Sequence, residues 1–159
     1  KLLRFMLYES RNDSISIAEE IRVLEDYIEL ERIRYNERLS VRFNKSIDCD
    51  NQAIAPLILL PFVENAFKHG ASEARFSSYI YIDVVLKEGQ LKFTVENSKD
   101  EEPEKPITEN IGLSNVRRQL VLMYPEHGLH VQNEKNRFYI HLTINLRKHA
   151  TVSVHHSGG

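Results

Sequence analysis

The stretch APLILLPFVENAFKHG, residues 55–70, combines an apolar helical pattern with a concentration of polar side chains. Pro56 suits a first helical turn, and Pro61 would bend or restart the helix, because proline lacks the amide that a helix interior uses. Gly70 is a typical helix stop. The apolar positions that follow Pro61 recur at helical spacing: Phe62, Val63, Ala66 and Phe67. The stretch therefore predicts a largely buried helix that ends near residue 70.

Four polar side chains interrupt this apolar helix and form its candidate site: Glu64, Asn65, Lys68 and His69. Burying such groups without partners costs several kcal/mol, so we expect the helix to present them to a ligand or to a wet cleft. Glu64 and Lys68 are four residues apart, as are Asn65 and His69, so the two pairs stack on neighbouring faces. The spacing leaves one alternative open, an ordinary solvated face held by a Glu64–Lys68 pair.

A long helix is predicted upstream of this stretch. Ser16 and Glu19 form a capping-box pattern, and no proline or glycine follows before about Asn36. Apolar residues alternate at four- and three-residue spacing, with Glu31 at the skipped position: Ile17, Ile21, Leu24, Ile28 and Tyr35. This pattern is typical of a seam between helices and implies a partner helix. Packing of the same stripe on its own domain is the alternative.

Period-2 alternation predicts strands in the rest of the chain. Residues 39–47 alternate apolar and polar side chains, as a half-buried strand does. Residues 79–97 predict two strands joined by a tight turn at Glu88–Gly89, and residues 128–146 predict a second pair that turns near Lys135–Asn136. The order of elements favours an α+β domain, a two-layer sandwich with helices on one face of a mixed, mostly antiparallel sheet, preceded by a helical segment.

Residues 98–110 are acidic and punctuated by proline, which predicts a mobile loop, and helical spacing returns over residues 111–124. Gly112 opens this helix, where unpaired N–H groups face the loop and a phosphate fits. Plain capping is the alternative for a single glycine. Arg117 and Arg118, one turn later, either reach the phosphate or solvate the helix.

Composition bounds the class of protein. The 159 residues are 42% hydrophobic and 28% charged, as in a soluble globular domain, and the net charge of −2 argues against nucleic acid as a direct partner. Cys49 is the only cysteine, which excludes an internal disulfide and favours a reducing compartment. Phosphate-cradle motifs of the GxxxxGK[ST] and GxGxxG types are absent, as are HExxH and GxSxG.

Together these segments resemble the LytS/YehU-type sensor histidine kinases, a branch of the GHKL ATPases with the Bergerat fold. Residues 14–39 resemble the second helix of the family's dimerisation and phosphoacceptor region, and residues 56–70 resemble its N box. The resemblance implies three parts. They are a remnant of the helical region (residues 1–37), an ATP-binding catalytic domain (38–148) and a tail (149–159).

The resemblance also implies roles for single residues. Asn65 would bind Mg²⁺, Glu64 would polarise or orient the reacting group, and Lys68 and His69 would face the phosphates of ATP. Asn97 stands where the family has its adenine-binding aspartate. An amide there still donates and accepts, without the charge-assisted bond of a carboxylate.

The glycine-rich box of the family is partly kept. Gly112, Leu113 and Asn115 match it, whereas Asn110 replaces its first glycine and Lys99 replaces a glycine of the adenine box. Residues 98–110 would form the lid over ATP. Because this lid has several acids and little glycine, we expect it to hold ATP weakly when its partner helices are absent.

By this resemblance the chain catalyses phosphoryl transfer from ATP·Mg²⁺ to a histidine upstream of Lys1, so none of its seven histidines is the acceptor. A response regulator, of the LytTR type, would then receive the phosphate. The chain would form a homodimer through its helical region and lie on the cytoplasmic side of an inner-membrane sensor. Two alternatives remain: a degenerate module of the same fold that has lost tight ATP binding, and a dimerisation domain built on the residue 16–36 seam.

Overall fold

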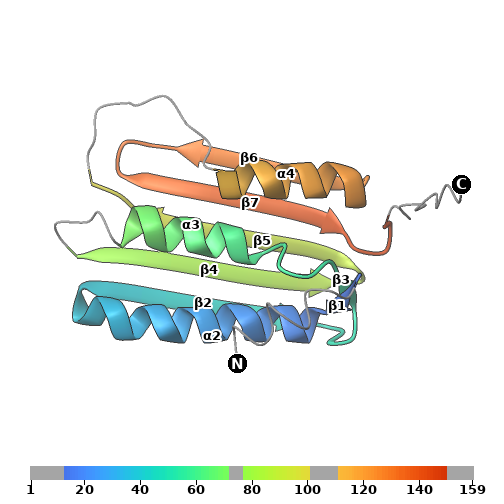
Figure 1. Ribbon diagram of the computed structural model, residues 1–159, viewed down its shortest axis with the longest axis horizontal. Coiled ribbons are helices and arrows are strands. Elements are labelled where there is room, and N and C mark those ends of the chain that lie inside the picture. Colours follow the sequence, from blue (N-terminus) through green and yellow to red (C-terminus); the bar gives the residue numbers. More distant parts are fainter. Residues whose placement is uncertain (1–12, 72–76, 101–110, 150–159) are drawn as a thin grey trace, which may run out of the picture.

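The computed structural model describes residues 13–71, 77–100 and 111–149 (Figure 1). Its helices are α2 (Ile17–Tyr35), α3 (Leu60–Gly70), α4 (Ile111–Met123) and the short 3-10 helix η2 (Asn36–Arg38). Its long strands are β2 (Leu39–Ile47), β4 (Ser78–Lys87), β5 (Gln90–Ser98), β6 (His127–Asn133) and β7 (Arg137–Asn145). Two short strands, β1 (Ile15–Ser16) and β3 (Ala53–Ile54), pair with each other.

The long strands form one sheet in the order β2-β4-β5-β7-β6, and the three α-helices lie on one face of it (Figure 1). Strand β2 runs parallel to β4, while every other neighbouring pair in this sheet is antiparallel. The predicted α+β class, with helices on one face of a mixed and mostly antiparallel sheet, is confirmed. No helix in the described ranges is both long and apolar enough to span a membrane.

The hydrophobic core lies between the helices and the inner face of the sheet. Strand β4 shows the alternation, because four of its side chains are buried: Ile80, Ile82, Val84 and Leu86. The intervening Tyr81 and Asp83 are exposed on the opposite face. Register places Ile82 opposite Phe43 of β2 and Val95 of β5, so one apolar layer continues across the strands.

Both predicted hairpins are present. Glu88 and Gly89 have φ angles of 49° and 77° between β4 and β5, the two left-handed residues that a tight hairpin turn requires. Strands β6 and β7 form the second hairpin, with Lys135 and Asn136 in its turn.

The predicted capping box at the start of α2 is confirmed. The backbone N–H of Glu19 donates to Oγ of Ser16 at 3.2 Å, and the N–H of Ser16 donates to Oε2 of Glu19 at 3.0 Å. These reciprocal bonds satisfy two amide groups that the first helical turn leaves without a partner, so the helix begins where the sequence indicates.

The apolar stripe of α2 packs on the chain's own domain. Four of its five residues are no more than 4% exposed and belong to the core that also contains the sheet: Ile17, Ile21, Leu24 and Ile28. The fifth, Tyr35, is half-buried and stacks on Phe67 of α3. The structure therefore supports the second interpretation of the stripe, and these four side chains are not available to a partner helix.

The helix predicted from Pro56 begins later. Leu57 has a φ of 57°, outside the helical region, so residues 56 and 57 form a turn and α3 starts at Leu60 with Pro61 in its first turn. The amides of Leu57 and Leu59 donate to a side chain of α2 instead of remaining for a helix. Gly70 is the last residue of α3, as the sequence predicts.

Candidate functional site

Helix α3 divides its four polar residues between two environments. Asn65 is 5% exposed, whereas Glu64 and Lys68 are exposed and His69 is half-buried. Because adjacent helical residues point about 100° apart, Asn65 faces the interior of the domain while Glu64 faces outward. The surrounding protein still removes part of the water from the exposed Glu64 carboxyl, and this partial desolvation raises its pKa.

Asn97 lies against the C-terminal end of α3. It is 1% exposed at the end of β5, and its Nδ2 donates to the carbonyl of Ser98 at 3.0 Å. A Cβ atom added to Gly70 would lie 2.8 Å from Cβ of Asn97, so the last turn of α3 and the end of β5 are in direct contact.

The amide oxygen of Asn97 is buried and lacks a hydrogen-bond partner within the described part of the chain. A buried acceptor left unpaired costs about 1–3 kcal/mol, so it is a feature that a ligand with an N–H group would relieve. The exocyclic amine of adenine is such a donor, and Asn97 therefore fits the adenine-contacting role that the family resemblance implies.

The residues of the predicted glycine-rich box lie on α4, which packs beside α3. Leu113 is 9% exposed and belongs to the core, while Gly112 and Asn115 are exposed. The structure thus groups Glu64, Asn65, Lys68 and His69 on one helix that contacts both the strand of Asn97 and the helix of Gly112. Of the predicted lid, Asn110 and the rest of residues 101–110 lie outside the described residues.

Lys99, which replaces a family glycine, contacts the β6–β7 turn. Its backbone N–H donates to the carbonyl of Asn136 at 3.1 Å, and its amine contacts Oδ1 of Asn133. Lys99 therefore ties the residues that follow β5 to the neighbouring hairpin.

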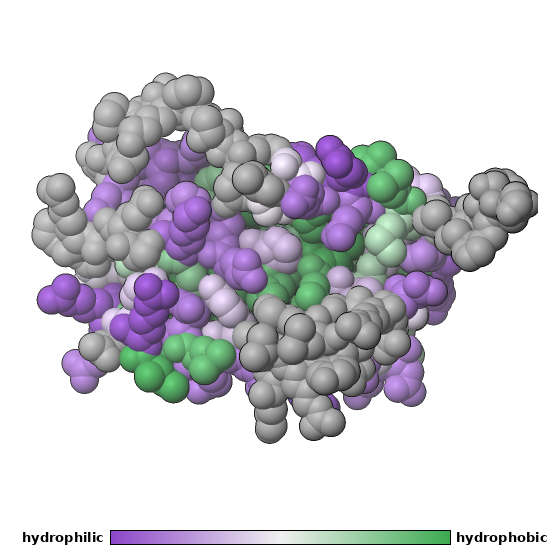
Figure 2. All heavy atoms as spheres, viewed as in Figure 1, coloured by the Kyte–Doolittle hydropathy of each residue, from purple (hydrophilic) through white to green (hydrophobic). Residues whose placement is uncertain are grey.

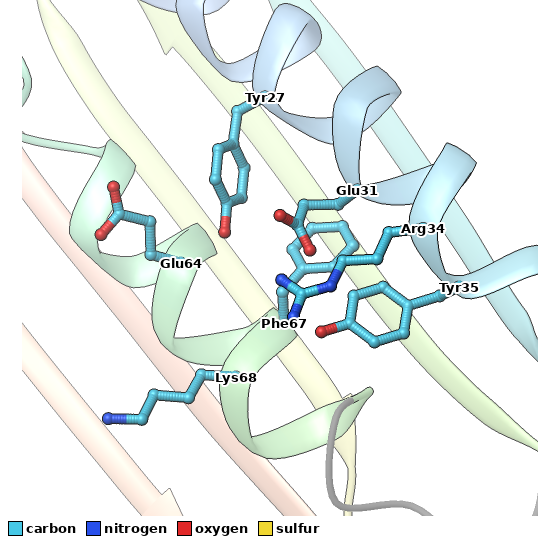
Figure 3. A pocket seen from close by; sticks show the side chains of 7 residues that line it. All are labelled: Tyr27, Glu31, Arg34, Tyr35, Glu64, Phe67 and Lys68. Atoms are coloured by element: carbon cyan, nitrogen blue, oxygen red, sulfur yellow. The ribbon is translucent and has the colours of Figure 1, made fainter.

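A pocket between α2 and α3 was not predicted from the sequence (Figure 3). It has a volume of about 230 Å³ and is lined by Tyr27, Glu31, Arg34, Tyr35, Glu64, Phe67 and Lys68. The sequence did contain a signal for the α2 wall of the pocket. The four α2 residues of this set follow i, i+4, i+7 and i+8 spacing, which places them on one side of a helix. Their pairing with α3 is a long-range contact that periodicity does not reveal.

Aromatic rings form the inner wall of this pocket. The Phe67 ring meets Tyr27 edge-on at 5.6 Å between centroids and Tyr35 in a stacked arrangement at 6.5 Å. The Tyr27 and Tyr35 hydroxyls both point into the space between the helices (Figure 3). Burial, and then the nearby carboxylates of Glu31 and Glu64, raise the pKa of the Tyr27 hydroxyl.

Glu20 is a further structural feature that was not predicted from the sequence. Its side chain is fully buried, and its carboxyl oxygens accept the backbone N–H groups of Leu57 at 2.9 Å and Leu59 at 3.1 Å. Burial raises the pKa of Glu20 to about 7, against the opposing effect of these bonds. From the other side, the Tyr124 hydroxyl accepts the N–H of Ala55 at 2.8 Å. Glu20 and Tyr124 together hold the turn that precedes α3.

Comparison with known sequences points to one class of protein. A family model described as histidine kinase matches residues 1–39. The sensor protein LytS of Staphylococcus epidermidis is 27% identical over 116 residues, which cover 73% of this chain and 20% of that protein. The sensor protein kinase HptS of Staphylococcus aureus is 20% identical over 152 residues, which cover 86% of this chain and 29% of that protein. The chain thus spans less than a third of the length of either relative.

Solved structures show the same fold. The catalytic domain of histidine kinase ThkA superposes with a TM-score of 0.59 at 18% identity, covering 82% of this chain and 94% of that chain. The histidine kinase domain of the blue-light activated kinase of Erythrobacter litoralis EL346 gives a TM-score of 0.61 at 21% identity, covering 86% and 69%. The fold, the family model and the sequence relatives agree, and the chain is similar to sensor histidine kinases such as LytS.

Proposed function

We propose that the chain is the ATP-binding catalytic part of a two-component sensor histidine kinase. The observation that carries the proposal is the unpaired, buried amide oxygen of Asn97, which lies against the end of the helix that bears Asn65. An acceptor beside a helix rich in polar residues suits a ligand with an amine at one end and phosphates at the other.

Each polar residue has a part in this proposal. The adenine amine donates to Oδ1 of Asn97, while Lys68 and His69 face the phosphates. Gly112, Leu113 and Asn115 bring the N-terminal amides of α4 toward the same phosphates, since the start of a helix favours anions. Mg²⁺, when bound, neutralises phosphate charge, and Asn65 would supply its protein ligand, in keeping with the few protein ligands that Mg²⁺ takes beside phosphates.

The reaction proposed is transfer of the γ-phosphoryl group of ATP to a ring nitrogen of a histidine upstream of Lys1. The bond between the γ-phosphorus and the bridging oxygen breaks, a phosphorus–nitrogen bond forms, and ADP leaves. The chain contributes mainly position and charge, because phosphoryl transfer asks little covalent chemistry of the protein. Glu64, exposed next to Asn65, would orient the imidazole and receive its proton.

The partners in this proposal are a response regulator and a second copy of the protein. A solved complex of histidine kinase ThkA with the response regulator protein TrrA shares the fold, with a TM-score of 0.50, and supports a regulator as the next phosphate acceptor. We propose a regulator of the LytTR type, a homodimer formed through the helical region, and a place on the cytoplasmic side of a membrane-anchored sensor.

A degenerate module of the same fold is the second candidate. The substitutions Asn97 and Lys99 favour it, because Lys99 is bonded to the β6–β7 turn where the family has a glycine. Such a module would keep the helices and sheet but bind ATP weakly or not at all.

Calorimetry with a non-hydrolysable ATP analogue and Mg²⁺ separates the two candidates. A kinase part gives Mg²⁺-dependent heat and a rise in thermal stability, whereas a degenerate module gives neither at millimolar ligand. In the kinase case, Asn65→Ala removes Mg²⁺-dependent binding and leaves the fold intact. Asn44→Ala, which changes an exposed asparagine on β2, is the matched control and binds as the wild type does. Unchanged affinity in Asn65→Ala would refute the role of Asn65.

A further inference from the structure

We propose that Glu20 is a positioning residue for the ATP site, which fixes the start of α3 from α2 and, through that helix, the side chain of Asn65. The inference rests on the proposed kinase function, because it concerns the residue proposed to bind Mg²⁺ beside the phosphates of ATP. In this role Glu20 acts through the backbone of the chain and not on the nucleotide itself.

Glu20 joins two segments that are far apart in the chain. Its carboxyl oxygens accept the N–H groups of Leu57 at 2.9 Å and of Leu59 at 3.1 Å, which lie 37 and 39 residues further along. The side chain of Glu20 is 0% exposed, so bulk water does not compete for these bonds. The start of α2 and the chain that leads into α3 therefore meet at this carboxyl group, near the short β1–β3 pair (Figure 1).

Helix α3 has no side-chain cap of its own. Leu59, the residue before its first turn, makes no capping hydrogen bond with its side chain, and Pro61 has no backbone N–H. The carboxyl group of Glu20 lies at this end of the helix instead, where the partial positive charge of the backbone favours an anion. Glu20 therefore stabilises the start of α3 from another helix.

The turn before α3 is strained and needs such a contact. Leu57 has a φ of 57°, a left-handed conformation that costs a residue with a side chain about 1–2 kcal/mol. A residue keeps this conformation only where the surrounding structure holds it. The N–H of Leu57 donates to Glu20, so loss of the carboxylate allows the turn to relax and releases the start of α3.

Asn65 lies between two points at which α3 is held. At the far end of the helix Gly70 is in contact with Asn97, and at the near end Glu20 binds the N–H of Leu59. Because α3 has 11 residues, we expect it to move as one body about the Gly70 contact when its start is released. Asn65 then shifts while Asn97 stays in place. The proposed metal ligand therefore depends on Glu20, whereas the proposed adenine contact does not.

The beginning of α2 gives Glu20 a rigid base. Ile17 and Leu24, about one turn to either side of it, are 0% exposed. The exposed apolar residues Leu30 and Ile33 lie further along α2, where Figure 2 shows apolar atoms at the surface. Glu20 thus projects from a part of the helix that is packed on the core of the domain.

The test measures the affinity for a non-hydrolysable ATP analogue with Mg²⁺, and again with the metal removed by EDTA, at pH 8. Burial raises the pKa of Glu20 to about 7, so at pH 8 the wild type carries the carboxylate. We expect Glu20→Gln to weaken binding about tenfold in the presence of Mg²⁺, as loss of a group that supports a metal ligand does. Without Mg²⁺ its affinity should match that of the wild type, because the adenine contact is unchanged.

Two controls separate this effect from a loss of charge or of stability. Glu29→Gln makes the same change at an exposed residue of α2 and should bind as the wild type does in both conditions. Ile144→Val removes a methyl group from a buried residue of β7, which costs about 0.5–1.5 kcal/mol of stability. Because Ile144 does not lie on α2 or α3, this variant should also keep both affinities.

A purely structural role of Glu20 would lower the affinity by the same factor with and without Mg²⁺, and that result would overturn the inference. Wild-type affinity of Glu20→Gln in both conditions would overturn it as well. If Glu20→Gln does not fold, Glu20→Asp replaces it, since the shorter side chain keeps the charge but displaces it, and its loss should again be confined to the Mg²⁺ condition. A wild type that does not bind the analogue would instead remove the proposed function, and this inference with it.

Discussion

Gly70 and Asn97 are in van der Waals contact at the junction of α3 and β5. A Cβ atom at residue 70 would lie 2.8 Å from Cβ of Asn97, closer than such atoms approach in proteins, and 3.0 Å from its Nδ2. The backbone of Gly70 does not have a positive φ, so the glycine is required here by close approach and not by a left-handed conformation. This contact fixes where the amide of Asn97 lies.

We predict that Gly70→Ala both destabilises the domain and weakens nucleotide binding. The added methyl group pushes against a fully buried side chain, and overpacking of this kind costs about 1–3 kcal/mol. Displacement of Asn97 moves its free oxygen away from the adenine amine. Chemical denaturation measures the first effect and calorimetry with the ATP analogue measures the second.

Gly128→Ala is the control for this variant. Its added Cβ would lie 2.9 Å from Oγ1 of Thr143, the end of a side chain on the β6–β7 hairpin. That hydroxyl is the end of a side chain that can change rotamer, and Gly128 lies on β6 and not on α3 or β5, so nucleotide affinity should not change. Equal affinities in the wild type and Gly70→Ala would show that Asn97 does not contact the nucleotide.

Asn97→Asp should tighten adenine binding. A carboxylate forms a charge-assisted bond with the adenine amine, which is worth about 1 kcal/mol more than a neutral bond, or roughly fivefold in Kd. The same change loses the bond from Nδ2 to the Ser98 carbonyl, so the free protein should become less stable while the complex becomes tighter. Titration of both proteins with the ATP analogue checks this. Weaker binding would mean that the pocket is built around the amide.

The sequence predicted the elements whose signals are local. The Ser16–Glu19 capping box, the Glu88–Gly89 turn and the helix that ends at Gly70 each depend on residues a few positions apart, and all three are confirmed. The fold class followed from their order. The roles of Asn65 and Asn97 stay predictions, although the contact of Gly70 with Asn97 now joins the two segments that carry them.

Long-range contacts account for what the sequence did not predict. The parallel pairing of β2 with β4 and the short pairing of β1 with β3 join segments that are far apart in the chain. The chain is not helical at Pro56 and Leu57 because Glu20, on another helix, accepts the backbone N–H groups of Leu57 and Leu59. The α2 stripe was ambiguous because periodicity gives the apolar side of a helix but not what covers it.

Glu20 should make the stability of the domain depend on pH. Its pKa is raised from 4.5 to about 7 in the folded protein, chiefly by burial. The folded state therefore keeps a proton that the unfolded state releases near its ordinary pKa. This contribution is fully present below pH 4.5, and it is lost as the pH rises through 7, by an amount of about 3 kcal/mol.

Glu20→Gln tests this pH dependence. The amide stays neutral and keeps a carbonyl acceptor for one of the two backbone N–H groups, so its unfolding free energy should change less between pH 5 and pH 8 than that of the wild type. Urea denaturation at several pH values measures both proteins. Parallel pH profiles would show that another group titrates. Glu19→Gln changes an exposed acid on the same turn and serves as the control.

Tyr124→Phe should show that the turn before α3 is held from two sides. The hydroxyl of Tyr124 accepts the N–H of Ala55, and its loss leaves that buried amide unpaired at a cost of about 1–3 kcal/mol. Glu20 binds the same turn two and four residues further on, at Leu57 and Leu59. Because one turn serves both side chains, the double variant with Glu20→Gln should lose less stability than the sum of the single losses. Strictly additive losses in urea denaturation would mean that the two side chains stabilise independent parts of the fold.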